Sequence, residues 1–238
     1  MPTPTLVVPP RFQTGITGFD LITEGGLPLG RTTLVAGTAG GKTVLAIQML
    51  VRAAEQGAGG VFVLSGGPDR SHRERGIVRL RPAAPHRRGA ASPSSTRRTI
   101  RARSWSRSVA SRPVSALFAR IESAAKRVGA KVAVIDSVGA IFPQFSDPNL
   151  VRRELHRIAH GLRQLGITTL MTVERIEEQG PVARFGVEEF VADNVIILRN
   201  ALELEKRRRT IEILKFRGCT HTRRASTRSR SIRPMPSR

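Results

Sequence analysis

The chain has 238 residues, which is enough to bury one sizeable core, and its single cysteine, Cys219, excludes an internal disulfide and fits a reducing compartment. Its formal net charge of +22 ordinarily favours a nucleic-acid or other anionic partner, but residues 70–113 and 217–238, the arginine-rich stretches, supply nineteen of these charges. The sequence predicts neither a signal peptide nor an apolar run of membrane-spanning length, so we expect a soluble cytoplasmic protein without a membrane partner.

Residues 11–29 are rich in threonine and glycine and predict a turn-rich lead-in to a central strand. Over residues 32–50 an apolar run, a glycine-rich turn and an apolar-periodic helix follow one another, which is the layout of a phosphate-binding loop. In such a loop backbone N–H groups cradle the β-phosphate, a lysine meets the β and γ oxygens, and the next hydroxyl, that of Thr43, holds Mg²⁺. The N-terminal dipole of the helix also favours phosphate. The residues predicted to bind the nucleotide phosphates are Gly37, Thr38, Ala39, Gly40, Gly41, Lys42, Thr43 and Val44.

The spacing of the glycines departs from the GxxxxGK[ST] pattern, which puts the first glycine at position 36, where Ala36 stands. Either the loop begins at Ala36 with a small residue in the leading place, or it has lost one residue and one phosphate-binding N–H. A third interpretation is a plain strand-turn-helix in which the glycines only make the turn.

Residues 60–65 are apolar and β-branched and predict the next strand. Residues 66–113 show neither helical nor strand periodicity and, taken alone, predict a disordered basic linker. Order returns with a helix that begins at residue 114 and ends at Gly129.

A buried strand over residues 132–135 then ends at Asp136. A carboxylate at the tip of a parallel strand lies at the crevice where such sheets bind ligands, so Asp136 is placed to hold Mg²⁺ through water. The alternative is that Asp136 caps a turn with Ser137.

The remaining pattern predicts a helix over residues 150–165, a strand over 167–173, a loop over 174–190, and a hairpin of strands at 194–199 and 209–216. Strands that alternate with helices build parallel sheets. We therefore expect an α/β fold with a mostly parallel central sheet, helices on both faces and a C-terminal hairpin.

Three blocks of the sequence together resemble the KaiC family of RecA-like circadian-clock ATPases, in particular the N-terminal of its two ATPase halves. These blocks are RFQTGITGFDLITEGGLPLGRTTLVAGTAG, KVAVIDSVGAIF and GITTLMTVERIEEQGPVARFGVEEFVADNVIILRNALELEKRRRTIEILKFRG. The resemblance covers residues 11–65 and 114–221 and implies a RecA-like P-loop NTPase that forms a hexamer with ATP and Mg²⁺ bound between subunits. It further implies slow ATP hydrolysis in the N-terminal half and serine/threonine autokinase activity in the C-terminal half, of which this chain matches only the former.

The stretch KFRGCTH resembles the family's Lys-x-Arg-Gly-Thr-x-His segment, which reaches the nucleotide of the neighbouring subunit. The resemblance makes Lys42, Lys215 and Arg217 the catalytic cations, the last two acting in trans on the charge of the γ-phosphate. Without it, Lys215 and Arg217 would be a basic pair on a solvated strand end. The resemblance also implies contacts with the base or sugar from Phe216, Cys219 and His221, with cysteine in place of the usual threonine.

The chain departs from the family at several positions. Gly66 and Gly67 stand where the family has a Glu-Glu pair, the general base that activates water, and the phosphate loop is one residue short. Losing a general base lowers a rate by about 10² to 10⁴. Residues 70–113 and those beyond 221 resemble nothing in the family, so we expect one ATP-binding domain over 1–221, interrupted at 66–113, with weak or lost hydrolysis, and a basic disordered tail over 222–238.

Two other functions stay open. A basic RecA-like protein could bind nucleic acid through its arginine-rich stretches, although Trp105 is the only tryptophan and tyrosine is absent, so a base-stacking platform is missing. An inactive subunit could join a ring with intact KaiC-like or clock proteins. A separate hypothesis is frame-shifted translation of the anomalous stretches, which reading the coding DNA in its other two frames would test.

Overall fold

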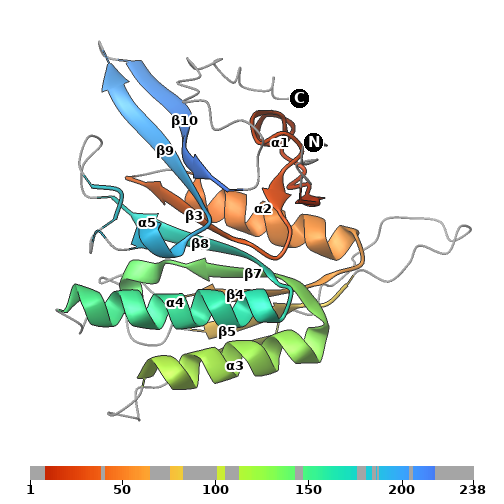
Figure 1. The fold of residues 1–238 in the computed structure, drawn as a ribbon. Helices are drawn as coiled ribbons and strands as arrows, with labels where there is room; N and C mark the ends of the chain where they lie inside the picture. The colour runs from red at the N-terminus through yellow and green to blue at the C-terminus, as the bar shows by residue number, and fades with distance from the viewer. Residues whose placement is uncertain are drawn as a thin grey trace, which may run out of the picture.

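The computed structural model describes residues 9–38, 41–64, 76–82, 101–104, 113–142, 147–175, 181–183, 186, 188–203 and 206–217. Within these residues, the strands that run parallel are β9 (Asn194–Glu203), β3 (Thr32–Gly37), β8 (Thr168–Glu174), β7 (Ala130–Asp136) and β4 (Gly59–Leu64). The strands with antiparallel pairing lie toward the two edges and are β10 (Lys206–Phe216), β5 (Gly76–Leu80) and β6 (Arg101–Ser104). Together they form one sheet in the order β10-β9-β3-β8-β7-β4-β5-β6 (Figure 1). The predicted α/β class with a mostly parallel central sheet is confirmed.

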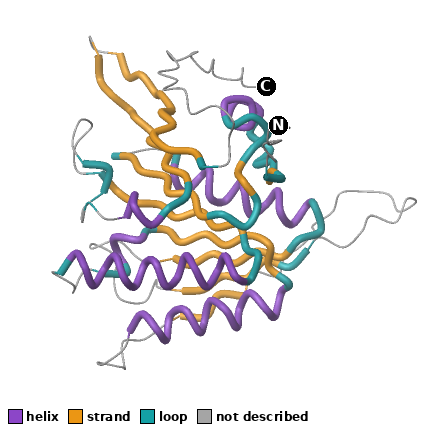
Figure 2. The backbone as a smooth tube through the Cα atoms, viewed as in Figure 1, coloured by secondary structure: helices purple, strands orange, loops and turns teal. Residues whose placement is uncertain are grey.

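Helices cover both faces of this sheet. Alternate residues of a strand point to opposite sides, so each face carries apolar side chains that the helices bury. On β3, Leu34 and Ala36 pack in the cluster under α3 (Pro113–Val128) and α4 (Pro148–Gln164). Val35 packs in the other cluster, under α2 (Lys42–Glu55) and the short α1 (Thr17–Ile22). Figure 2 shows the strands in orange between α2 on one side and α3 and α4 on the other.

The helix α4 illustrates how local sequence sets an element's limits. The side chain of Asp147 accepts a hydrogen bond from the backbone N–H of Asn149 at 2.9 Å, and Pro148 occupies the first turn, where it loses no intrahelical bond. Gly166 follows the helix with a φ of 67°, a conformation that favours glycine. The prediction of a helix in this region is confirmed.

The first arginine-rich stretch contains two strands, so the prediction that residues 66–113 lack regular structure is wrong in part. β5 pairs antiparallel with β4, and β6 pairs antiparallel with β5. Ile77 packs against the cluster under α3, and Leu80 packs against the opposite cluster. The edge of β4 offers unpaired backbone groups, and pairing with them favours a strand at β5. The sequence pattern of β5 is too short to predict that strand by itself.

The predicted C-terminal hairpin is confirmed and is longer than expected. β9 and β10 pair antiparallel from Glu203 opposite Lys206 to Asn194 opposite Phe216. The preceding segment, expected to be a loop, includes the four-residue helix α5 (Glu188–Val191).

The other short elements are β1 (Arg11–Phe12), β2 (Leu27–Pro28) and the 3₁₀ turn η1 (Val138–Ala140). In the part of the chain that the structure describes, no helix has the length and apolar character needed to cross a membrane.

Candidate nucleotide-binding site

The loop between β3 and α2 starts after Gly37. Ala36 is a buried interior residue of β3 that pairs with Val173 on β8 and with Ile197 on β9, so it does not lead the loop. Only residues 38–41 separate the strand from Lys42, the first residue of α2. Of the two alternatives for the spacing, the loop that has lost one residue fits the structure, and a loop led by Ala36 does not.

Two glycines have conformational reasons to be in this loop. A Cβ on Gly37 would lie 2.5 Å from the backbone oxygen of Leu198, because β9 passes directly beside it. Gly41 precedes the helix with a φ of 108°, which an L side chain rarely adopts. Ala39 and Gly40, also assigned to phosphate binding, lie outside the described residues.

The side chain of Lys42 turns back toward the strand that precedes it. Its Nζ donates to the backbone oxygen of Gly37 at 2.7 Å, and the backbone N–H of Arg175 donates to the same oxygen at 3.1 Å. Burial lowers the pKa of Lys42, and the carboxylates of Glu174 and Asp136 oppose this shift. The amine therefore has a partly desolvated position near two carboxylates, where an anionic ligand would favour its charged form.

The carboxylate of Asp136 joins three elements at the end of the parallel strands. Its Oδ2 accepts a hydrogen bond from the hydroxyl of Thr43 on α2 at 2.8 Å. Its Oδ1 accepts one from the hydroxyl of Thr172 on β8. Both carboxylate oxygens of Asp136 accept hydrogen bonds from other elements, so the alternative in which Asp136 only caps a turn does not fit the structure.

The donor set of this site suits Mg²⁺. It offers one hydroxyl and one carboxylate, and Mg²⁺ is typically bound by one or two such protein oxygens together with waters and phosphate oxygens. Among the described residues, no group of three or more His, Cys, Asp or Glu side chains could hold a metal ion by itself. The residues present therefore fit a metal that arrives with a phosphate ligand.

Thr172 was not singled out by the sequence analysis. It is one of three buried threonines on β8, two positions before the strand ends at Glu174. Residue type alone does not separate it from Thr168 and Thr169, so the sequence holds no clear signal for it. Val44, in contrast, was assigned to the site, and its side chain is 66% exposed on the outer side of α2.

The residues predicted to act in trans lie far from Lys42 in the same chain. Lys215 pairs with Val195 near the start of β9, whereas Gly37 pairs with Leu198, further along the same strand. With β10 two strands away from β3, the strand spacings separate the Cα atoms of Lys215 and Gly37 by about 14 Å. A lysine side chain does not span this distance, so Lys215 does not serve the phosphate loop of its own chain.

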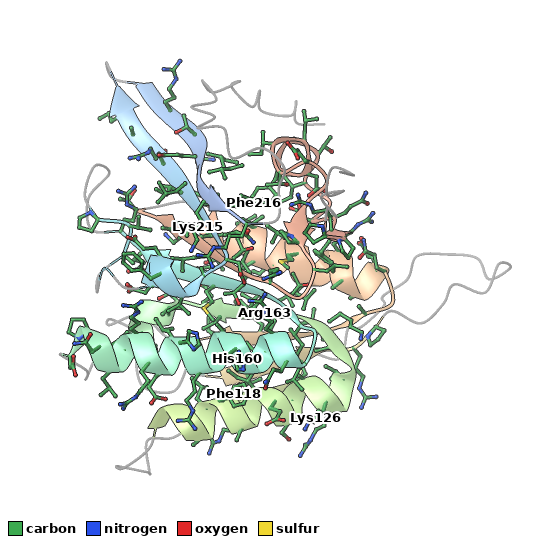
Figure 3. The ribbon with its side chains drawn as sticks, viewed as in Figure 1. Phe118, Lys126, His160, Arg163, Lys215 and Phe216 are labelled. Atoms are coloured by element: carbon green, nitrogen blue, oxygen red, sulfur yellow. The ribbon has the colours of Figure 1, made fainter. Side chains whose placement is uncertain are left out.

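Lys215 is held at the base of the hairpin (Figure 3). Its Nζ donates to the backbone oxygens of Ala192 at 2.7 Å and Glu189 at 3.4 Å. Burial lowers the pKa of Lys215, the neighbouring Arg217 lowers it further, and the carboxylates of Asp193 and Glu189 oppose the shift. The side chain of Arg217 is exposed beyond the last residue of β10.

Phe216 is half-buried against the cluster under α2 (Figure 3). The guanidinium carbon of Arg11 lies 5.1 Å from the centroid of its ring, a distance typical of a cation–π contact. The structure thus brings Lys42, Thr43 and Asp136 together and keeps Lys215, Phe216 and Arg217 at a separate place. The other candidate positions lie outside the described residues and are Gly66, Gly67, Cys219 and His221.

Comparison with known proteins matches the chain to the family model described as "ATPase: KaiC" over residues 12–75 and 90–228. The match takes in parts of both arginine-rich stretches, so the expectation that nothing in residues 70–113 or beyond 221 resembles the family is wrong.

Two relatives illustrate the similarity. The chain is 47% identical over 218 residues to the circadian clock protein KaiC3 of Synechocystis sp., covering 89% of this chain and 42% of the relative. It is 44% identical over 227 residues to the circadian clock oscillator protein KaiC of Synechococcus elongatus, covering 89% of this chain and 41% of the relative. The chain therefore spans about two fifths of the length of the curated relatives it matches.

Proposed function

The chain belongs to the KaiC family of ATPases, which are RecA-like, and from this premise we propose that it binds ATP with Mg²⁺ at the loop between β3 and α2. The observation that carries the proposal is the hydrogen bond of 2.8 Å between the hydroxyl of Thr43 and the carboxylate of Asp136, beside the amine of Lys42. A cation, a hydroxyl and a carboxylate at the N-terminus of a helix are what a metal-bound triphosphate requires.

Each of these residues has a separate task. Lys42 would exchange the backbone oxygen of Gly37 for oxygens of the β- and γ-phosphates, whose negative charge would offset the effect of burial that lowers the pKa of its amine. The hydroxyl oxygen of Thr43 would be a metal ligand, and the carboxylate of Asp136 would hold the metal through water. Mg²⁺ supplies neutralisation of the charge on the β and γ oxygens.

The shortened loop lowers the expected affinity. With one residue fewer between Gly37 and Lys42, the loop has one backbone N–H fewer for the phosphates. A hydrogen bond to a charged group contributes about 1.5–3 kcal/mol, so we expect ATP to bind about 10- to 100-fold more weakly than in a loop of full length.

We also propose that hydrolysis is weak or lost. Gly66 and Gly67 stand where the family has its carboxylate pair, and glycine cannot accept a proton from water. The autokinase activity implied by the resemblance belongs to the other half of the family protein and forms no part of this proposal.

The position of Lys215 supports assembly into a homo-oligomer, a hexamer by resemblance. Since Lys215 is remote from the loop of its own chain, its charge can act on a nucleotide only from a neighbouring copy. Arg217 follows it at the same end of the sheet and would act with it. A second copy would then complete the site.

ATP binding by the wild type and by Lys42→Ala tests the proposal. Lys126→Ala is the matched control, because Lys126 is an exposed lysine on α3 that pairs with Glu122 at 2.8 Å, away from the loop between β3 and α2. We expect the first variant to lose affinity and the second to keep it.

A further inference from the structure

Thr172 lies beside Asp136 because of the order of the strands. β8 runs between β3 and β7, and Ile135 on β7 pairs with Met171 on β8. Asp136 and Thr172 are the next residues along the two strands. Strand pairing therefore fixes the contact between Asp136 and Thr172, which does not depend on a long, flexible side chain.

The two oxygens of the Asp136 carboxylate have different surroundings. Oδ2 accepts from Thr43, whose side chain is exposed at the start of α2. Oδ1 accepts from Thr172, which is fully buried in the middle of the sheet. The two hydroxyls come from different elements, and each donates to a different oxygen of the carboxylate.

The two hydroxyls have different roles in the proposed site. The oxygen of Thr43 would also be a metal ligand, so the position of its hydroxyl would depend on the metal. The hydroxyl of Thr172 would not touch the metal, and it is therefore the donor that would hold the plane of the carboxylate while Oδ2 faces Thr43.

We propose that Thr172 is a positioning residue that orients Asp136 for metal binding. The proposal rests on the proposed function, because it concerns the same ATP and Mg²⁺ site. Removing a residue that hydrogen-bonds to a metal ligand without touching the metal typically weakens metal binding by about 10- to 100-fold.

The test is a titration with MgCl₂ of the binding of a fluorescent ATP analogue. Thr172→Val keeps the shape of the side chain and removes its hydroxyl, and Thr172→Ser restores the hydroxyl. We expect Thr172→Val to raise the MgCl₂ concentration at half-maximal binding by about 10- to 100-fold. Binding of the analogue in EDTA should stay unchanged, and Thr172→Ser should bring the MgCl₂ midpoint back to that of the wild type.

Thr169→Val is the matched control. Thr169 is also buried on β8, but its hydroxyl donates to the backbone oxygen of Ile167 at 3.4 Å and not to Asp136. Its substitution should leave the MgCl₂ midpoint unchanged. If Thr172→Val does not fold, Thr172→Cys, which retains the side-chain size with only a weak donor, carries the same expectation.

Three results would overturn the proposal. They are an unchanged MgCl₂ midpoint in Thr172→Val, a midpoint in Thr172→Ser that rises equally, and a loss of binding in EDTA that matches the loss in MgCl₂. Absence of binding by the wild type at any MgCl₂ concentration is a different outcome, because it refutes the proposed function itself and the role of Thr172 with it.

Discussion

Replacing Gly37 with alanine tests the close contact between β3 and β9 at the residue that precedes the phosphate loop. The added Cβ would lie 2.5 Å from the backbone oxygen of Leu198, and contacts shorter than 3.0 Å essentially never occur for real Cβ atoms. The neighbouring atom is backbone, so β3 and β9 must separate locally. Overpacking of this kind costs about 1–3 kcal/mol, which for a domain of this size lowers the Tm by about 2 to 12 °C.

The assay is thermal unfolding of Gly37→Ala against Gly139→Ala, followed by circular dichroism. Gly139 has no atom within 4 Å of a built Cβ and no positive φ, so its substitution controls for the added methyl group. We also expect Gly37→Ala to weaken ATP binding, because the displaced Gly37 oxygen positions both Lys42 and the backbone of Arg175. Equal Tm values for the two variants would refute the close contact between β3 and β9.

Two further predictions concern the cations at the base of the hairpin. A double variant with Lys215→Ala and Arg217→Ala should bind ATP more weakly than the wild type, and mixing it with Lys42→Ala subunits should restore binding, because each supplies what the other lacks; no gain on mixing would contradict action in trans. Burial lowers the pKa of Lys215 in the folded state, so the free-energy cost of its charge is present at neutral pH and disappears as the pH rises through that lowered pKa toward 10.5. The wild type should therefore gain stability relative to Lys215→Met over that range in urea unfolding, and a difference that stays constant with pH would show that the pKa is not lowered.

The local parts of the site could be predicted from the sequence, because they depend on neighbours in the chain. Lys42 and Thr43 open a helix directly after a glycine turn, and Asp136 ends a strand. Since the carboxyl ends of parallel strands meet at one edge of a sheet, these residues were expected to approach one another, and the hydrogen bond between Thr43 and Asp136 is consistent with that expectation.

The role of Thr172 could not be predicted in the same way. β8 follows β7 in the chain but is inserted between β7 and β3 in the sheet, and this order is not encoded in any local pattern. The residue at which the phosphate loop starts could not be predicted either, because it is set by strand pairing. Ala36 pairs with both β8 and β9 and therefore lies inside β3. The contact of Thr172 with Asp136 and the start of the loop thus both depend on position within the sheet and not on residue type.

The strands of the first arginine-rich stretch were missed for a related reason. β5 has five residues, GIVRL, which is too short a pattern to stand out from its surroundings. It forms a strand because the edge of β4 pairs with it and both faces of the sheet bury its apolar side chains. Tertiary contacts override weak local preference in such a case.

The most direct test of the central claim is an equilibrium titration of ATP in MgCl₂ with the wild type, Lys42→Ala and Lys126→Ala, in which released phosphate is followed in the same samples. We expect saturable binding by the wild type and by Lys126→Ala, at least about tenfold weaker binding by Lys42→Ala, and little released phosphate. Equal binding by all three proteins would contradict an ATP site at this loop. Rapid release of phosphate that Lys42→Ala abolishes would contradict the claim that hydrolysis is weak or lost.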